Sequence, residues 1–132
     1  MNAELRIGLK GKAETIVTEK NTAKSLGSGL VDVFATPALI GLMEGAAVNA
    51  LVLNPEDSSV GTALDIKHLA ATPVGMRVWA EAELVEIDRR RLIFEVNAYD
   101  EVEKIGTGRH ERFIIKKDQF LKKAELKAKN QE

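Results

Sequence analysis

The chain has 132 residues, of which 45% are hydrophobic and 30% are charged. This length suits one compact domain and excludes a multidomain enzyme, while the composition excludes a disordered or fibrous protein. The 19 Lys and Arg residues nearly balance the 20 Asp and Glu residues, giving a formal net charge of -1. We therefore expect no partner among nucleic acids or anionic membrane surfaces.

The chain contains no cysteine, which excludes disulfides, thiolate metal sites and a cysteine nucleophile. The segment Met1 to Lys12 is interrupted by charged side chains and lacks the apolar core of a signal peptide. We therefore expect a cytoplasmic protein. We also expect no cofactor. A metal in particular is not expected, because His68 and His110 lie far apart in the sequence and have no partners at metal-ligand spacing.

The first elements in chain order are a strand over Gly11 to Thr18 and a long helix over Pro37 to Leu53. Thr36 is a good N-cap, a proline suits the first helical position, and Asn54-Pro55 makes a sharp stop. The helix is apolar on nearly every side, so another layer must wrap it. Its apolar run contains Glu44 and is too short for a membrane span.

Alternation of side chains predicts four longer strands after this helix, over Ser59 to Thr72, Met76 to Asp88, Leu92 to Glu103 and Lys104 to Lys116. The connections between them are short enough for antiparallel neighbours. The tail from Lys117 onward predicts a short amphipathic helix that frays. The order of elements predicts an α+β domain in which an antiparallel sheet wraps around one long central helix.

Three residues are candidates for catalytic chemistry. Glu44 is the only charged residue between Thr36 and Pro55, at the border of the apolar stripe, and it also fits the solvent-exposed edge of the helix. His68 is in phase with the apolar side chains of its strand and should point inward, as a proton carrier or as a hydrogen-bonded core residue. Thr36 lies at a helix N-terminus, where it either caps the helix or also contacts a ligand.

Two further residues are candidates for substrate binding. Gly61 would let a substrate approach the backbone N–H closely, and a bulge or tight packing would explain it equally well. Arg112 is in phase with His110 and with two glycines of the same predicted strand, a face that another backbone or a ligand could approach. Its guanidinium could hold a carboxylate or phosphate, or form a salt bridge to an acid such as Glu44.

Three segments together resemble a known family: VFATPALIGLME at 33–44, VGTALDIKHLAATP at 60–73 and IGTGRHERF at 105–113. Their order and spacing are similar to those of the fluoroacetyl-CoA thioesterase-like family of hotdog-fold proteins. The resemblance extends over nearly the whole chain. It implies a hotdog fold, in which a sheet curls around a central helix, and a homodimer with the active site at the subunit interface.

The resemblance also implies an acyl-CoA substrate and a role for each candidate residue. Thr36, Glu44 and His68 would be catalytic, Gly61 would offer its backbone N–H to the thioester carbonyl, and Arg112 would support the site. Glu44 would act as nucleophile or as base toward water, with Thr36 positioning the groups and His68 moving the proton. Both a covalent acyl intermediate and direct hydrolysis are compatible with this set.

One departure from the family concerns the segment before the first motif. The named activity is associated with an aromatic residue in a lid there, whereas Lys20 to Leu30 contains none and is rich in small residues. We therefore expect hydrolysis of a small or medium acyl thioester. Two other functions fit the same residues: a hotdog hydratase or dehydratase acting on acyl thioesters, and a non-catalytic module that binds an acyl group or small molecule.

Overall fold

The structure is a computed structural model that describes residues 4–129. In chain order its elements are β1 (Lys10–Ile16), the 3-10 turn η1 (Glu19–Asn21), α1 (Ala23–Leu26), α2 (Thr36–Asn49), β2 (Asp57–His68), β3 (Arg77–Asp88), β4 (Arg91–Asp100), β5 (Lys104–Lys116) and α3 (Lys117–Lys129). The predicted order of strands and long helices is confirmed. The two short segments η1 and α1 were not predicted, because each is too short to show a periodic pattern.

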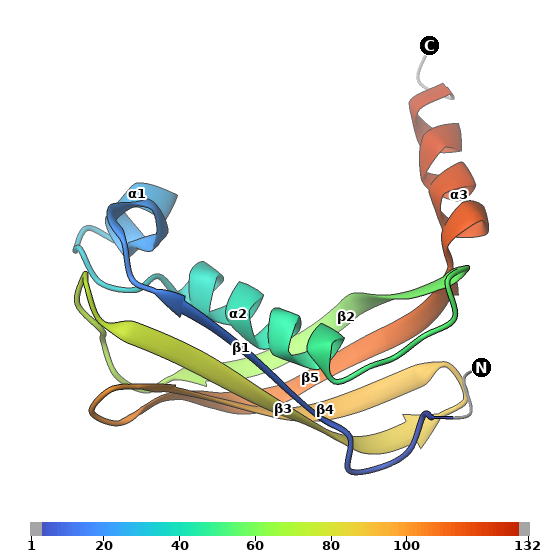
Figure 1. Ribbon diagram of the computed structural model, residues 1–132. Helices are drawn as coiled ribbons and strands as arrows, with labels where there is room; N and C mark the ends of the chain where they lie inside the picture. Colours follow the sequence, from blue (N-terminus) through green and yellow to red (C-terminus); the bar gives the residue numbers. More distant parts are fainter. Residues whose placement is uncertain (1–3, 130–132) are drawn as a thin grey trace.

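The five strands form one antiparallel sheet in the order β1-β3-β4-β5-β2, so β1 and β2 are its edges. The sheet is curled, α2 lies across its concave face, and α3 projects away from the end of β5 (Figure 1). This arrangement confirms the predicted α+β class, with an antiparallel sheet around one long helix. The described residues include no helix that is both long and apolar enough to cross a membrane.

One side of α2 forms the centre of the core. Leu39, Met43, Ala46 and Ala47 are fully buried against the sheet. The small alanines let β1 approach the helix so closely that backbone atoms of α2 occupy the place where a side chain on Gly11 would begin. No other residue fits at this crossing without moving the helix.

The opposite side of α2 is uncovered by the described part of the chain. Pro37, Gly41, Glu44 and Val48 follow one another at helical spacing and define the open face of α2. Three of them are exposed and Glu44 is half-buried. The expectation that another layer wraps the helix is thus met within this chain on one side only. This face and the edge strand β2 remain available to a second molecule.

The ends of α2 differ from the prediction. The N-cap is Ala35, and no side chain of residues 4–129 caps the helix, so the expected capping role of Thr36 is wrong. The helix ends at Asn49 rather than Leu53, because the N–H of Ala50 bonds to carbonyl groups of the preceding turn and tightens it. Since Thr36 belongs to the first helical turn, its hydroxyl is left for another partner.

Candidate active site

The first cluster joins the start of α2 to the end of β2. The Oγ1 atom of Thr36 lies 2.7 Å from Nδ1 of His68, within hydrogen-bond distance. The two residues are 32 positions apart in the sequence, and only the packing of α2 on the sheet brings them together. The hydroxyl therefore orients the imidazole ring instead of capping the helix.

The second ring nitrogen of His68 is the chemically reactive feature of this cluster. Nε2 is buried and has no hydrogen-bond partner among the described residues. Burial lowers the pKa of His68 below its usual value, and the nearby backbone of Ala70 opposes the shift. The imidazole is therefore neutral near pH 7 and can accept a proton. A buried nitrogen without a partner is costly, so Nε2 is suited to a group supplied from outside the chain.

A hollow of about 360 Å³ adjoins Thr36 and His68. This volume is near the lower end of the range for small-molecule sites. Its other lining residues are small or apolar, namely Ala23, Ser28, Val33, Phe34, Leu69, Ala70 and Ala71. The hollow is therefore suited to a short apolar group whose reactive end meets the hydroxyl and the imidazole.

The second cluster surrounds Arg112 on β5. Its Nη1 atom lies 3.5 Å from Oε2 of Glu44, and the Arg112 side chain is only 6% exposed, against 38% for Glu44. The guanidinium also donates from Nε to Ser59 Oγ at 2.8 Å and from Nη2 to the Ser59 carbonyl at 2.9 Å. Burial lowers the pKa of Arg112, and the charge of Glu44 opposes this shift. The salt bridge between Arg112 and Glu44, one of the two roles expected for this guanidinium, is thus present.

Gly61 completes the second cluster through a bulge in β2. The register of β2 against β5 shifts between Gly61 and Ala63, which leaves Thr62 as the extra residue. Gly61 consequently faces the same side as its partner Arg112. A Cβ atom at Gly61 would lie 2.6 Å from Oε2 of Glu44, so the absence of a side chain makes room for the carboxylate. The bulge interpretation of Gly61 is confirmed.

The phase of β2 changes at this bulge. Simple alternation predicted that Val60 and His68 share one face of the strand. In the structure Val60 pairs with Phe113, on the opposite face from the Gly61–Arg112 pair, whereas His68 pairs with Gly106 on the inner face. The inward direction of His68 is therefore correct, and the predicted position of Val60 is wrong.

The two clusters are separate within one chain. Thr36 and Glu44 are eight residues apart on α2, which corresponds to about 12 Å along the helix axis. The structure therefore brings Thr36 to His68, and Glu44 to Gly61 and Arg112. One buried residue of the second cluster, His110, was not among the predicted site residues. Its position two residues before Arg112 on the same strand was the available signal.

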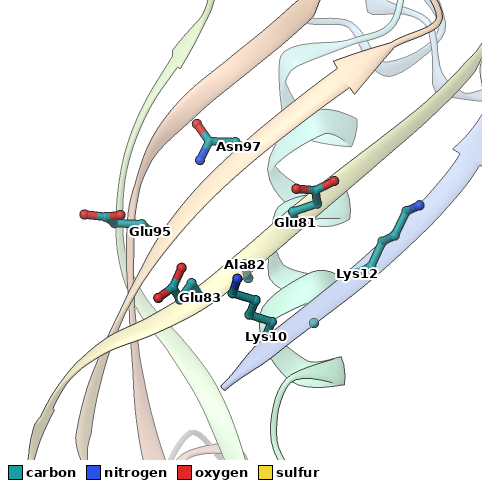
Figure 2. A pocket seen from close by; sticks show the side chains of 8 residues that line it. Lys10, Lys12, Glu81, Ala82, Glu83, Glu95 and Asn97 are labelled. Atoms are coloured by element: carbon teal, nitrogen blue, oxygen red, sulfur yellow. The ribbon is translucent and has the colours of Figure 1, made fainter. Parts of the chain in front are cut away.

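A different hollow lies on the outer face of the sheet, with α2 behind the strands (Figure 2). Charged and polar side chains dominate its lining, which consists of Lys10, Gly11, Lys12, Glu81, Ala82, Glu83, Glu95 and Asn97. It contains none of the predicted site residues and lacks a histidine or hydroxyl that could take part in acyl transfer. Residues 4–129 also contain no group of three or more His, Cys, Asp or Glu residues arranged to hold a metal ion.

Comparison with known proteins finds a family model and a relative that are both described as fluoroacetyl-CoA thioesterases. The model of the family described as fluoroacetyl-CoA-specific thioesterase matches residues 17–118. The fluoroacetyl-CoA thioesterase of Streptantibioticus cattleyicolor is 37% identical over 135 residues, covering 96% of this chain and 97% of that protein.

Solved structures give the same result. A threonine-to-serine variant of the fluoroacetyl-CoA thioesterase FlK, in complex with acetyl-CoA, is 37% identical with a TM-score of 0.88, covering 93% of this chain and 98% of that chain. A Thermus thermophilus protein described as a thioesterase superfamily member is 28% identical with a TM-score of 0.86, covering 99% and 100%. The curled sheet and central helix are thus those of the hotdog fold, as predicted.

Proposed function

The chain belongs to the fluoroacetyl-CoA-specific thioesterase family, and from this membership we propose that it hydrolyses a small or medium acyl-CoA to the free acid and CoA. The observation that carries the proposal is the hydrogen bond between Thr36 and His68 beside a hollow of about 360 Å³. The unpartnered Nε2 of His68 lies at the same place. This combination offers a neutral base next to a space for a short acyl chain.

The reaction needs little help with the leaving group, because a thiolate of pKa about 8.5 departs readily. The enzyme must instead activate the attacking group and stabilise the carbonyl oxygen as it becomes negative. In our proposal Glu44 attacks the carbonyl carbon directly or takes a proton from an attacking water. The backbone N–H of Gly61 donates to the oxyanion, a contribution of about 3 kcal/mol. If Glu44 attacks the carbonyl carbon, the C–S bond breaks and water then cleaves the acyl–Glu44 anhydride. In both routes the proton that water loses reaches the neutral imidazole of His68, in the second route by way of Glu44. His68 then transfers this proton to the CoA thiolate.

Because Thr36 and Glu44 are about 12 Å apart along one helix, we propose that a homodimer brings them together. The open face of α2 and the unpaired edge of β2 are both left uncovered by the described part of the chain, and in our proposal they form one interface. Gly41 has nothing within 4 Å of its Cβ position, which allows close helix approach. A two-fold axis near Ile40 and Gly41 would place Thr36 and His68 opposite Glu44 of the partner subunit.

The nature of the acyl group follows from the lining of the hollow. Its wall combines alanine and serine with larger apolar side chains, and a relative has been solved with acetyl-CoA bound. These features support a short acyl chain as substrate. The cytoplasmic location inferred from the sequence stays a prediction.

The decisive experiment measures free thiol released from a panel of acyl-CoA esters of increasing chain length. A thioesterase releases thiol. A hotdog hydratase or dehydratase would instead change the absorbance of an enoyl or hydroxyacyl ester while the thioester survives. A binding module would do neither and would only retain the ester. Absence of thiol release from every ester would refute the proposed function.

The pH dependence of hydrolysis follows from the environment of His68. Burial lowers the pKa of the His68 imidazole below its ordinary value of about 6.5. The neutral base therefore predominates above that pH and is lost as the pH falls through the lowered pKa. We expect kcat/KM to decline on the acid side, with the midpoint of the decline below about pH 6.5. A profile that stays flat down to pH 5 in a protein that remains folded would contradict this role.

Gly61→Ala is expected to lower kcat/KM by about 100-fold, because the new methyl group would lie 2.6 Å from Oε2 of Glu44 and displace the carboxylate. The matched control is Gly45→Ala on α2, where the added carbon meets Ala13 at an ordinary 3.6 Å. That variant should hydrolyse the ester at the wild-type rate. Equal activity of the two variants, measured by thiol release, would show that the space at Gly61 is unimportant.

A further inference from the structure

We propose that His110 is a positioning residue for this reaction: it holds the guanidinium of Arg112 in the orientation that keeps Glu44 in place. The effect of His110 on catalysis depends on the proposed function. Its structural basis is independent of that function, because it depends only on the contacts of His110 and Arg112.

The hydrogen bonds of His110 fix its tautomer. Its Nδ1 atom lies 3.0 Å from the carbonyl oxygen of Ala63. A carbonyl oxygen only accepts, so Nδ1 carries the proton and Nε2 has a free lone pair. Nη1 of Arg112 lies 3.0 Å from Nε2 and donates to it. The buried imidazole is thus a neutral bridge between a backbone carbonyl and a cation.

The electrostatic surroundings keep His110 in this neutral state. Burial is the main factor that lowers the pKa of His110, and the charge of Arg112 lowers it further. The Ala63 carbonyl and the carboxylates of Glu44 and Glu111 oppose the shift. Protonation would place two positive groups 3.0 Å apart and remove the acceptor for Arg112. The neutral form is therefore the one that supports the cluster near pH 7.

The contacts of Arg112 show why Nε2 of His110 is needed as a hydrogen-bond acceptor for the guanidinium. Ser59 binds Nε and Nη2 and so fixes one edge of the guanidinium. Nη1 has two partners, His110 at 3.0 Å and Glu44 at 3.5 Å. Glu44 is partly exposed and can turn toward solvent, whereas His110 is 1% exposed and fixed at both nitrogens. His110 is therefore the fixed partner that holds Nη1 where Glu44 meets it.

The bulge in β2 helps to position the residues around Arg112. Thr62, its extra residue, donates from Oγ1 to a carboxylate oxygen of Glu111 at 2.6 Å. Ala63, the next residue, supplies the carbonyl that binds His110. The bulge therefore places Gly61 beside Glu44 and the Ala63 carbonyl beside His110. A single bulge thus makes room for the Glu44 carboxylate and also provides the carbonyl group that holds His110 beside Arg112.

Two substitutions at His110 separate its two hydrogen bonds. In His110→Asn the side-chain amide stands near the place of Nδ1, so it can still donate to Ala63 but gives Arg112 no acceptor. In His110→Gln the longer amide reaches the place of Nε2 and restores an acceptor for Arg112. We expect the Asn variant to lose about 10- to 100-fold in kcat with little change in KM. The Gln variant should recover most of this loss. Equal kcat values for the two variants would overturn the proposal.

A double variant tests whether His110 acts through Arg112. If it does, His110→Asn should have no further effect once Arg112→Gln has removed the guanidinium. The double variant would then hydrolyse the ester at the rate of Arg112→Gln alone. Multiplicative losses would mean that His110 contributes independently of Arg112, which contradicts the proposal.

A third test measures the mobility of the Arg112 guanidinium directly and does not depend on enzymatic activity. In the wild type the guanidinium is held on both edges, so NMR should resolve separate Nη signals for Arg112 at 25 °C. We expect these signals to merge in His110→Asn and to remain separate in His110→Gln. Unchanged signals in the Asn variant would overturn the positioning role. If the wild type released no thiol from any ester, the proposed function would fail while this measurement still decided the role of His110.

Discussion

His68→Ala is expected to reduce kcat/KM for acyl-CoA hydrolysis by about 10²- to 10⁴-fold, the range typical for loss of a positioned general acid or base. The imidazole is the only described group that combines a hydrogen bond to Thr36, a lowered pKa and a buried nitrogen without a partner. Removing it deletes the proton carrier and leaves the other lining residues of the hollow in place. Thiol release measures the loss.

The control for this prediction is Lys67→Ala, which changes the preceding residue of β2. Lys67 is exposed and lies on the opposite face of the strand, so this variant should keep wild-type activity. Circular dichroism and thermal unfolding would show that both variants fold. A folded His68→Ala protein that retained more than about a tenth of the wild-type rate would contradict the assigned role.

Mixing two inactive variants is expected to restore activity if the site spans two subunits. A heterodimer of His68→Ala and Glu44→Gln subunits would have one site that carries both changes and one site that carries neither. After random exchange half of the dimers are mixed, so about a quarter of all sites are intact. Thiol release should therefore rise from near zero to about a quarter of the wild-type rate.

The matched control for this experiment uses two residues of one cluster. Thr36 and His68 come from the same subunit and touch at 2.7 Å, so mixing Thr36→Val with His68→Ala creates no intact site. This mixture should stay at the mean activity of its two components. If mixed dimers form and the Glu44→Gln mixture also stays inactive, Glu44 acts within its own subunit. A monomer in size-exclusion chromatography would reject the proposed dimer.

The sequence determined the elements that carry the site. Alternation of side chains predicted β5 at the bounds it has, and a continuous apolar run predicted a central helix that contains Glu44. The phase of His68 predicted that it points inward, as it does. These predictions depend on short periods in the sequence: side chains return to the same face every 3.6 residues in a helix and every second residue in a strand. Burial of one face selects apolar residues at those positions, so the pattern can be recognised locally.

Only the tertiary structure decided how the candidate residues are grouped. Thr36 had the sequence features of an N-cap, yet its hydroxyl binds His68, because the helix begins one residue earlier than expected. The bulge after Gly61 moved that glycine to the inner face, where it makes room for Glu44. A bulge changes the phase of a strand by one residue, and the alternation of side chains alone does not reveal where it occurs.

The role of His110 was decided in the same way. Its position in the strand predicted a shared face with Arg112, but its bond to the Ala63 carbonyl joins residues 47 positions apart. Contacts of this kind depend on how strands are paired in the sheet and on the angle at which the helix crosses it. Local sequence patterns fix which face a side chain occupies, whereas long-range packing fixes which other side chains it meets there.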